Sequence, residues 1–468
     1  MKGIRLPVLV ASLLTVAGCN DLVVPDLNNP SLDDLVSNPT PTKIAAAAQG
    51  LMIGARAGMG AQNGYVSLLG ILGRESYNFD PADPRFITEM LIGPLDGGSP
   101  AFGANLWANP YQNIRNANIL LAALDVVSGI SDPAKEAARG YAKTIQALDF
   151  LQVIVTRDTN GAPIDVDRPP TGDPAPVMPR EDVYAHIVQL LDEADAHLAA
   201  AGAAAFPFEL SEGFTGFATP ATFRLFNRAL KARVEVYRGS LALAACGAGG
   251  ATCFTSALTA LGASFIDTAA SASLRLGVYH AFSTGSGDVT NAIFDPDGRA
   301  ILAHPSIETD AQLQAGGALD QRYLDKVTTT TPRTVQGITT DQLFTIYNTN
   351  EDPVPIIRNE ELILLRAEAN LGLGNLVDVV TDINTIRVRS GGLPLYTGAV
   401  TAAALETELL YNKRYSLLFE GGHRWIDLRR YGRLADVSLD LGMHTRQAAF
   451  PFPDAECLAR GSPNIPGC

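Results

Sequence analysis

The chain has 468 residues, with 49 Asp and Glu against 35 Lys and Arg, so its formal net charge is -14 at pH 7. Hydrophobic residues make up 47% and charged residues 18%, a balance that excludes a mostly disordered chain and is sufficient for a large buried core. The acidic excess repels phosphate backbones at long range, and no run of five basic residues offsets it. We therefore expect no nucleic-acid partner.

The N-terminus has the pattern of an export signal. Two basic residues within the first five precede an apolar stretch over residues 6–16, which is too short to span a membrane, and two small residues come directly before Cys19. Residues 16–19 resemble a bacterial lipobox, in which the cysteine is acylated; an ordinary signal peptide that happens to contain a cysteine is the alternative. We expect residues 1–18 to be a lipoprotein signal peptide, Cys19 to carry the lipid that attaches the chain to a membrane, and residues 19–41 to be a polar tether.

Four further cysteines form two pairs that are close in the sequence. Cys246 and Cys253 flank a Gly-rich stretch, and Cys457 and Cys468 flank a stretch with Gly and Pro. Export places them in an oxidising environment, so we predict both disulfides, each stabilising the fold by roughly 2 to 3 kcal/mol, in preference to four free thiols. None of these cysteines has the C-x-x-C spacing that is typical of zinc or redox sites.

Helical periodicity dominates the chain, and strand signals are scarce and short. Gly, Thr, Asp and Pro accumulate between about 200 and 220 and between about 265 and 350, where we expect loops or small irregular insertions. The expected helices cover 110–125 with Pro110 at the start, 133–156 after a cap at Ser131, 180–200, 220–245, 359–371 and 376–389. The last two form a helix pair of the tetratricopeptide type, although no strict repeat covers the whole chain.

Two C-terminal motifs resemble the RagB/SusD family of surface nutrient-binding lipoproteins. The first is LLRAEA at 364–369 with GN at 374–375 and DINTIRVR at 382–389, and the second is RYSLLFEGGHRWIDLRR at 414–430. Residues 111–118, 147–150 and 450–453 support the resemblance. Asn412 and Ser416 stand where the family more often has acidic residues, and the stretch from about 245 to 350 matches no motif of the family.

The resemblance implies a mostly α fold, a helical scaffold of tetratricopeptide-like helix pairs with loop-rich insertions. It implies one domain over 42–468, with the scaffold over about 42–245 and 351–434, a variable loop-rich region over about 246–350 and an extended segment over 435–468. It also implies a non-enzymatic lipoprotein of the outer-membrane surface. Such a protein binds an oligosaccharide or a peptide and delivers it, as a lid, to a TonB-dependent SusC-like β-barrel transporter.

The motif at 414–430 also invites a catalytic interpretation because acids, arginines and a histidine lie close together. On a helix that begins near His423, Asp427 can pair with Arg424 or Arg430, and no nucleophile or metal spacing accompanies them. We therefore interpret the motif as a buried ion-pair and aromatic clamp between helices. The residues assigned to this scaffold are Arg366, Glu368, Glu420, Arg424, Trp425 and Asp427.

Signatures of catalysis are missing from the sequence: it contains no G-x-S-x-G, no H-E-x-x-H and no phosphate-binding loop. We expect no catalytic residue, cofactor or metal, and interpret 295–298 as a turn in preference to a calcium loop. A glycosidase needs no fixed spacing between its two acids, so a surface glycoside hydrolase is the main alternative, and a purely structural surface protein is a third.

Flat aromatic rings beside polar groups are suited to binding a sugar or another amphipathic solute. Rings in irregular segments are the best candidates, with packing over the helices as their alternative role. The candidate ligand-binding residues are Tyr77, Phe79, Trp107, Tyr279, Phe282 and Phe294.

Overall fold

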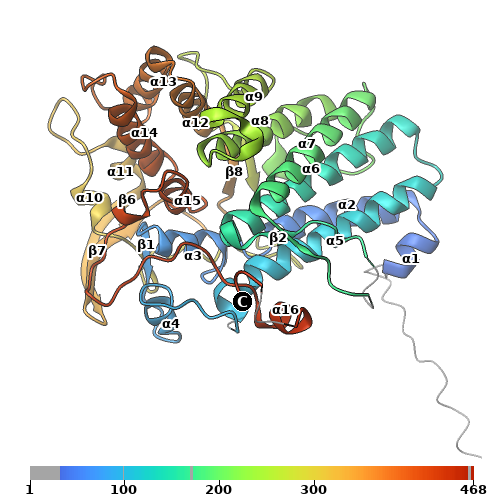
Figure 1. The fold of residues 1–468 in the computed structure, drawn as a ribbon, viewed down its shortest axis with the longest axis horizontal. Coiled ribbons are helices and arrows are strands. Elements are labelled where there is room, and N and C mark those ends of the chain that lie inside the picture. Colours follow the sequence, from blue (N-terminus) through green and yellow to red (C-terminus); the bar gives the residue numbers. More distant parts are fainter. Residues whose placement is uncertain (1–31, 99, 169–171, 462–464) are drawn as a thin grey trace, which may run out of the picture.

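The computed structural model describes residues 32–98, 100–168, 172–461 and 465–468. In Figure 1, one group of helices occupies the right half of the molecule, a second group lies at the upper left, and a small sheet lies at the lower left. The mostly α fold class with tetratricopeptide-like helix pairs is confirmed. The expected lipid attachment at Cys19 and the signal peptide lie outside the described residues.

The right-hand group contains the long N-terminal helices. They are α2 (Pro41–Arg56), α5 (Asn105–Val126), α6 (Asp132–Arg157) and α7 (Arg180–Ala200), preceded by the short α1 (Leu32–Ser37). Helix α6 lies at the centre, in contact with α5 and α7, and α2 packs against both α5 and α6. The core side of α6 carries Tyr141, Ile145 and Leu148 at helical spacing, and each of these is buried.

The second group continues the same packing of successive helices. It comprises α8 (Pro220–Ser240), α9 (Ala251–Gly262), α12 (Asn359–Gly372), α13 (Leu376–Arg389), α14 (Ala402–Ser416) and α15 (His423–Arg430). Helix α8 contacts α7 on one side and α9 and α12 on the other, so it joins the two groups. Its start is fixed by a capping box in which Thr219 and Thr222 bond each other's backbone N–H groups.

Two of the expected helix boundaries are wrong. Helix α5 begins at Asn105 and carries Pro110 inside, because Leu106 and Trp107 are buried and their packing extends the helix toward its N-terminus. Helix α8 ends at Ser240, ahead of the expected 245, and Ala242 then takes a positive φ of 48°, which is incompatible with a continuing α-helix. The expected helices at 180–200 and 376–389 have the observed bounds of α7 and α13.

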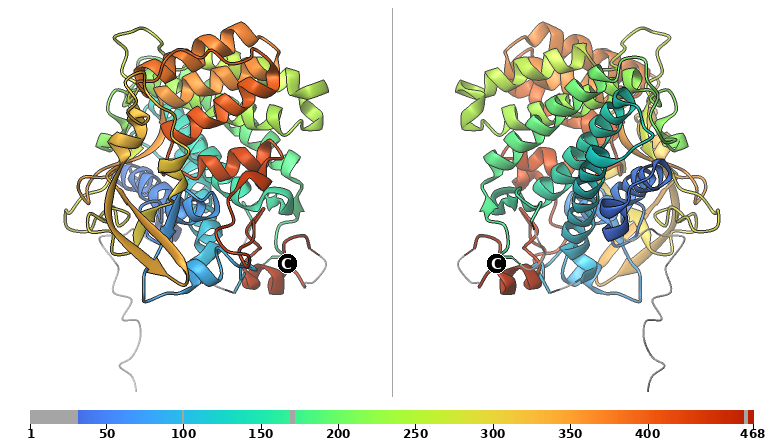
Figure 2. Two further views of the ribbon diagram at one scale, coloured as in Figure 1. Left: turned by 90° about the vertical axis from the view of Figure 1, so that its left-hand side faces the viewer. Right: turned by 90° about the vertical axis from the view of Figure 1, so that its right-hand side faces the viewer.

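The stretch from 265 to 350 contains more strand than the sequence analysis expects. A four-stranded antiparallel sheet has the order β1-β5-β7-β6, built from β1 (Ser76–Asn78), β5 (Ile301–Ala303), β6 (Val327–Val335) and β7 (Ile338–Phe344). Gln336 and Gly337 join β6 to β7 with φ values of 50° and 84°, as a two-residue hairpin turn requires. Figure 2 shows this hairpin at the outer edge of the molecule.

Smaller strands and helices complete the fold. The strand β4 (Gly277–His280) pairs with β8 (Val354–Arg358), and β2 (Ala162–Pro163) pairs with β3 (Val177–Met178). The short helices are α3 (Tyr65–Leu72), α4 (Arg85–Thr88), α10 (Ser306–Thr309), α11 (Gln321–Lys326) and α16 (Asp454–Ala459). The end of the expected tether is therefore helical in α1 and at the start of α2, and the expected extended C-terminal segment contains α16.

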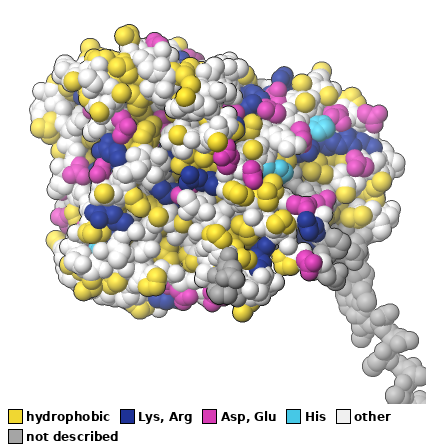
Figure 3. Space-filling view, viewed as in Figure 1, with side chains coloured by type: hydrophobic (Ala, Val, Ile, Leu, Met, Phe, Trp, Pro, Cys, Tyr) yellow, Lys and Arg dark blue, Asp and Glu magenta, His cyan; other side chains and the backbone are white. Residues whose placement is uncertain are grey.

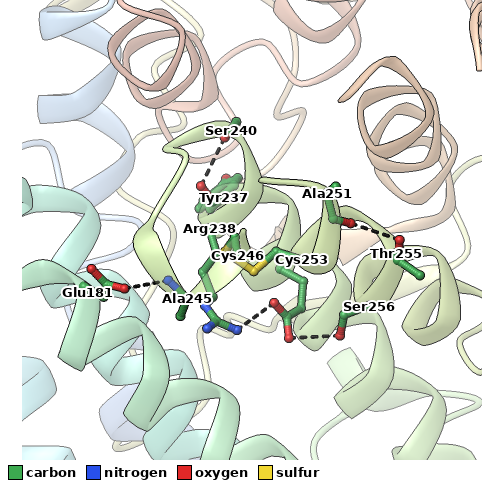
Figure 4. Close-up of a disulfide and its surroundings, with 11 residues drawn as sticks. Glu181, Tyr237, Arg238, Ser240, Ala245, Cys246, Ala251, Cys253, Thr255 and Ser256 are labelled. Atoms are coloured by element: carbon green, nitrogen blue, oxygen red, sulfur yellow. Dashed lines mark hydrogen bonds and ion pairs between the residues drawn. A yellow bond between two sulfur atoms is a disulfide. The ribbon is translucent and has the colours of Figure 1, made fainter. Parts of the chain in front are cut away.

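Both predicted cysteine pairs are disulfide-bonded in the structure. Cys246 and Cys253 have Cα atoms 5.0 Å apart, and Cys457 and Cys468 have Cα atoms 5.7 Å apart. The first bond links the turn after α8 to α9 (Figure 4). Polar contacts surround it, since Glu181 on α7 accepts from the Ala245 amide at 2.8 Å. The disulfide therefore fixes the chain where α7, α8 and α9 meet.

Acidic and basic side chains are interspersed on the face of the molecule that Figure 3 shows. Over α6 and α7, at the right of Figure 3, acidic and basic side chains lie next to one another. The ion pair between Lys143 and Glu193, 2.7 Å apart, joins these two helices. In the described part of the chain, no helix is both long enough and apolar enough to cross a membrane.

Candidate functional site

A groove with a cavity volume of about 630 Å³ lies between α2, β4 and two loops. Its first wall is one side of α2, and its second wall is formed by 209–214, including the short 3₁₀ turn η3 (Glu212–Phe214). Residues 279–283 and 286–288 close the remaining side. A groove of this volume is in the range that binds small molecules in proteins.

Helical spacing explains the wall formed by α2. Residues 49, 52, 53 and 56 follow the i, i+3, i+4, i+7 pattern and line the groove, whereas Ile44, Ala48, Leu51 and Ala55 on the other side are buried in the core. Ile53 is 59% exposed, which is unusual for a large apolar side chain. Within the described ranges, no helix covers this face of α2, where the groove lies.

Glycine permits the close approach of the second wall. A Cβ atom on Gly213 would lie 2.0 Å from the carbonyl oxygen of Tyr279, so only glycine lets η3 pack directly against β4. The pairing of β4 with β8 is irregular between Val278 and Tyr279. Such an irregularity redirects side chains, and Tyr279 consequently turns toward the groove.

Arg56 holds the loop after β4 in place. Its guanidinium donates to the backbone oxygen of Ala281 and forms an ion pair with Asp288, and it lies 5.3 Å from the ring centre of Phe282. The hydrogen bond from Arg56 lowers the pKa of Asp288, which is therefore ionised at neutral pH. The guanidinium charge is thus neutralised within the site.

The inner end of the groove is uncharged. Burial, together with the nearby charge of Arg56, lowers the pKa of His280 to about 3, so its imidazole is neutral near pH 7. His280 also lines a second cavity of about 50 Å³ that lies deeper, beside Arg233 and His423. In the described residues, no cluster of three or more His, Cys, Asp or Glu side chains is arranged to hold a metal ion.

Two of the six candidate ligand-binding aromatics line this groove. The ring of Tyr279 is half-buried, and its hydroxyl donates to the backbone oxygen of Arg275. Phe282 also lines the groove but is only 3% exposed, with Arg56 against its ring. Phe294 is half-buried, packs against the second hydrophobic cluster and does not belong to the lining.

The structure assigns Tyr77, Phe79 and Trp107 to the core instead of to a ligand surface. Tyr77 and Phe79 are each 2% exposed and stack with ring centres 5.4 Å apart. Trp107 is 5% exposed and packs against Phe452 with ring centres 4.8 Å apart. The prediction that these three contact a ligand is corrected, because β1 enters the sheet and α5 begins one turn earlier than expected.

One part of this architecture matches a known protein family. Residues 308–455 match the model described as the SusD family. Over these residues the chain is similar to that family. No curated protein matches it in sequence.

Solved structures of SusD-like proteins share the fold across almost the whole chain. NanU of B. fragilis superposes with a TM-score of 0.68 at 16% identity, covering 93% of this chain and 98% of that one. A SusD superfamily protein from Bacteroides vulgatus gives 0.65 at 18%, covering 92% and 99%. A laminarin-binding SusD-like protein gives 0.60 at 17%, covering 91% and 99%. At these identities the likeness shows the fold alone.

The region that matches the SusD family model contains a buried network of four charges. Glu368 on α12 lies 2.6 Å from Lys413 on α14 and 2.7 Å from Arg430 on α15. Asp427 lies 3.0 Å from Lys413 and 2.6 Å from Arg430, so the two acids share the two bases. This is the ion-pair clamp expected from the motif, with Lys413 as a member that the sequence analysis missed.

The other scaffold residues join neighbouring elements. Arg366 pairs with Asp382 on α13 at 2.6 Å, and Glu420 accepts from Arg358 at 2.8 Å. Trp425 is fully buried, and its indole N–H donates to the backbone oxygen of Gln447 at 2.8 Å. Asn412 and Ser416, which stand where the family more often has acids, both accept from Arg322 at 3.0 Å.

Arg424 departs from the expected clamp. Asp427 pairs with Arg430 and Lys413, and the guanidinium of Arg424 lies elsewhere, with Nε donating to the backbone oxygen of Gly73 at 2.9 Å. Arg424 and Arg430 both stand three residues from Asp427 on α15, so the spacing alone left both pairings open.

One arrangement outside the groove has the atoms of a serine hydrolase triad. The hydroxyl of Ser306 lies 2.7 Å from Nδ1 of His304, whose Nε2 lies 2.8 Å from Asp440. However, Nδ1 also receives the Ser306 amide at 3.0 Å, and Arg414 donates to the hydroxyl at 2.6 Å. The serine oxygen is therefore engaged within the fold, and neither Ser306 nor His304 lines the groove.

Proposed function

We propose that this SusD-like chain binds a neutral or amino-bearing oligosaccharide in the groove beside α2 and delivers it to a TonB-dependent SusC-like outer-membrane transporter. In this proposal, the lipid on Cys19 attaches the chain to the cell surface, residues 42–468 act as one domain, and binding involves no catalysis. The groove of about 630 Å³ that contains Tyr279 is the observation that supports it.

The lining offers the two kinds of contact that a sugar needs. Met52, Ile53 and the ring of Tyr279 provide apolar surface against which a pyranose face packs. Gln49 and Ser211 provide an amide and a hydroxyl that donate to and accept from sugar hydroxyls. A laminarin-binding protein and this chain share the fold, which supports the choice of a glycan as the ligand.

The charges of the lining favour ligands without a negative charge. Glu209 and Glu212 are exposed at the second wall, and Asp288 and Arg56 neutralise each other. With His280 neutral, the groove has one base and three acids, 1 - 3 = -2 in formal charge. Coulomb repulsion therefore disfavours uronates and other acidic sugars relative to neutral or amino sugars.

Calorimetric titration with a panel of neutral, amino-bearing and acidic oligosaccharides tests the proposal. Tyr279→Ala is expected to weaken binding of the preferred sugar by about tenfold, corresponding to about 1.4 kcal/mol. Tyr396→Ala is the matched control, because Tyr396 is also half-buried and donates its hydroxyl to a nearby backbone oxygen, that of Ala399. Equal losses in both variants, or binding of peptides in place of all sugars, would contradict a glycan site here.

A hydrolase is the alternative that the groove makes testable. Glu209 and Glu212 are the acids in the lining to which no described residue supplies a basic partner, so an acid and base pair there would come from them. We expect no release of reducing ends from the bound sugar. Hydrolysis that disappears in Glu209→Gln or Glu212→Gln would replace the binding function with catalysis.

Delivery and attachment require separate experiments. Purification from outer-membrane fractions is expected to yield the chain together with a β-barrel partner, and mass spectrometry is expected to find acylated Cys19 as the first residue. A chain recovered in the cytoplasm with an uncleaved N-terminus would refute the surface location.

A further inference from the structure

A third cavity lies between α14 and α15. Its volume is about 170 Å³, and its lining includes three arginines: Arg414 on α14, Arg424 on α15, and Arg433 after α15. At about 30 Å³ for each water molecule, the cavity has room for a small ion and not for an oligosaccharide. It shares no lining residue with the groove of the proposed function.

Arg424 brings an uncompensated positive charge to this cavity. Its Nε donates to Gly73, but neither terminal nitrogen has a hydrogen-bond partner in the described part of the chain, and no described carboxylate lies within 4 Å of the guanidinium. Burial, and then the charge of Arg414, lower the pKa of Arg424 to about 9, although the more distant carboxylates of Glu75 and Asp310 oppose this shift. Both effects disfavour the charged form of Arg424, and a bound anion would offset both.

The remaining charges of the lining are already matched. Arg433 pairs with Asp436 at 2.8 Å, and Arg414 pairs with Asp310 at 2.7 Å. Asp427, the other acid of the lining, is held by Lys413 and Arg430 in the buried network. Arg433 also lies 3.4 Å from Glu406, so Arg424 is the base of the lining to which the described residues supply no ion-pair partner.

We propose that the cavity between α14 and α15 binds a small oxyanion through Arg424, with Arg414 and Arg433 beside it. The planar guanidinium presents parallel N–H donors that match two oxygens of a phosphate, a sulfate or a carboxylate. Thr407, which also lines the cavity, accepts from Arg433 at 3.1 Å and so holds that guanidinium at the cavity. The Arg of the HRWIDL motif, which the ion-pair clamp does not use, acquires a role in this way.

Titration of the full chain with inorganic phosphate, at constant pH and constant ionic strength set with chloride, tests the proposal. We expect saturable binding at one site, weakened by about tenfold or more in Arg424→Gln and several-fold in Arg433→Gln. Arg299→Gln is the control, since Arg299 is an arginine with 83% of its side chain exposed, paired with Asp297 on the surface. Its phosphate affinity is expected to equal that of the unaltered chain.

Two further measurements keep the test decisive. If Arg424→Gln fails to fold because the bond to Gly73 is lost, Arg433→Gln and Arg424→Lys carry the comparison. Tighter binding of phosphate than of acetate identifies a tetrahedral anion, and the reverse identifies a carboxylate, so either order supports the oxyanion site. Non-saturable phosphate binding, or equal affinity in the Arg424 and Arg299 variants, overturns it, and neither outcome bears on sugar binding in the groove.

Discussion

Removal of the ammonium group of Lys413 tests whether the buried network holds α12, α14 and α15 together. Lys413 is 1% exposed, and its Nζ lies 2.6 Å from Glu368 and 3.0 Å from Asp427. Lys413→Met retains most of the side-chain volume but leaves two buried carboxylates with Arg430 as their shared base. Loss of one partner of a buried ion pair costs about 3 to 5 kcal/mol, which is a large part of the stability of an ordinary domain.

Urea unfolding of the variant and of a matched control measures this loss. Lys231→Met removes a lysine that also contacts a carboxylate, at 2.7 Å from Asp192, but this acid is 47% exposed. Solvent screens such a pair, so the control is expected to lose about 1 kcal/mol or less. A Lys413 variant that loses no more than the control would refute the assignment of the network to stability.

The pH dependence separates the loss of charge from the loss of packing. Burial alone would raise the pKa of Asp427, but Lys413 and Arg430 hold it below its usual value. Without Lys413 the folded-state pKa of this carboxyl rises, so it accepts a proton as the pH falls toward 5 and the destabilisation shrinks. An equal loss at pH 5 and pH 7 would show that packing, not charge, explains the effect.

Two further predictions concern other buried groups. Burial raises the pKa of Glu75 from 4.5 to about 7, so its contribution to stability is present below about pH 4.5 and is lost between there and pH 7, by about 3 kcal/mol in all. Glu75→Gln is therefore expected to gain stability relative to the unaltered chain as pH rises over this range in urea unfolding, and a pH-independent difference would contradict the assignment. Replacement of both Cys246 and Cys253 by Ser opens a loop with a sequence separation of 7 and is expected to lower the free energy of unfolding by about 2 kcal/mol. In the unaltered, unreduced chain, an alkylating reagent is expected to label neither cysteine.

The sequence predicts the long helices well because their information is local. In α7, the apolar spacing of Val183, Ile187 and Leu191 and the Pro at 179 specify both the face and the start of the helix. The β6–β7 hairpin escapes prediction because its strands, VTTTTPRTV and ITTDQLF, consist mostly of Thr and other polar residues, and Thr also counts toward a loop-like composition. Strand β1 pairs with β5 more than 200 positions later in the chain, a relation that no local pattern contains.

Some residues of the groove could also be predicted from local sequence, and others could not. Tyr279 and Phe282 could be proposed from the sequence because both are aromatic and lie in an irregular segment. Arg56 could not, because its partners Ala281 and Asp288 are 225 and 232 positions away. The exposed face of α2 is visible in the spacing of its residues, but the spacing does not show that a groove lies against it.

In helix α2, the residues that line the groove differ from those that are buried in the core. Residues 49, 52 and 53 contact the groove, while the side chains that hold the helix in the core stand at 44, 48, 51 and 55. Met52 also packs against the core, whereas Gln49 and Ile53 are exposed. Substitutions at 49 and 53 alter the ligand surface with little change in core packing, because surface changes ordinarily shift stability by no more than about 0.5 kcal/mol. Related chains could therefore diverge in the sugar they bind through this one helix face, and a library restricted to these two positions would explore new specificities on an unchanged scaffold.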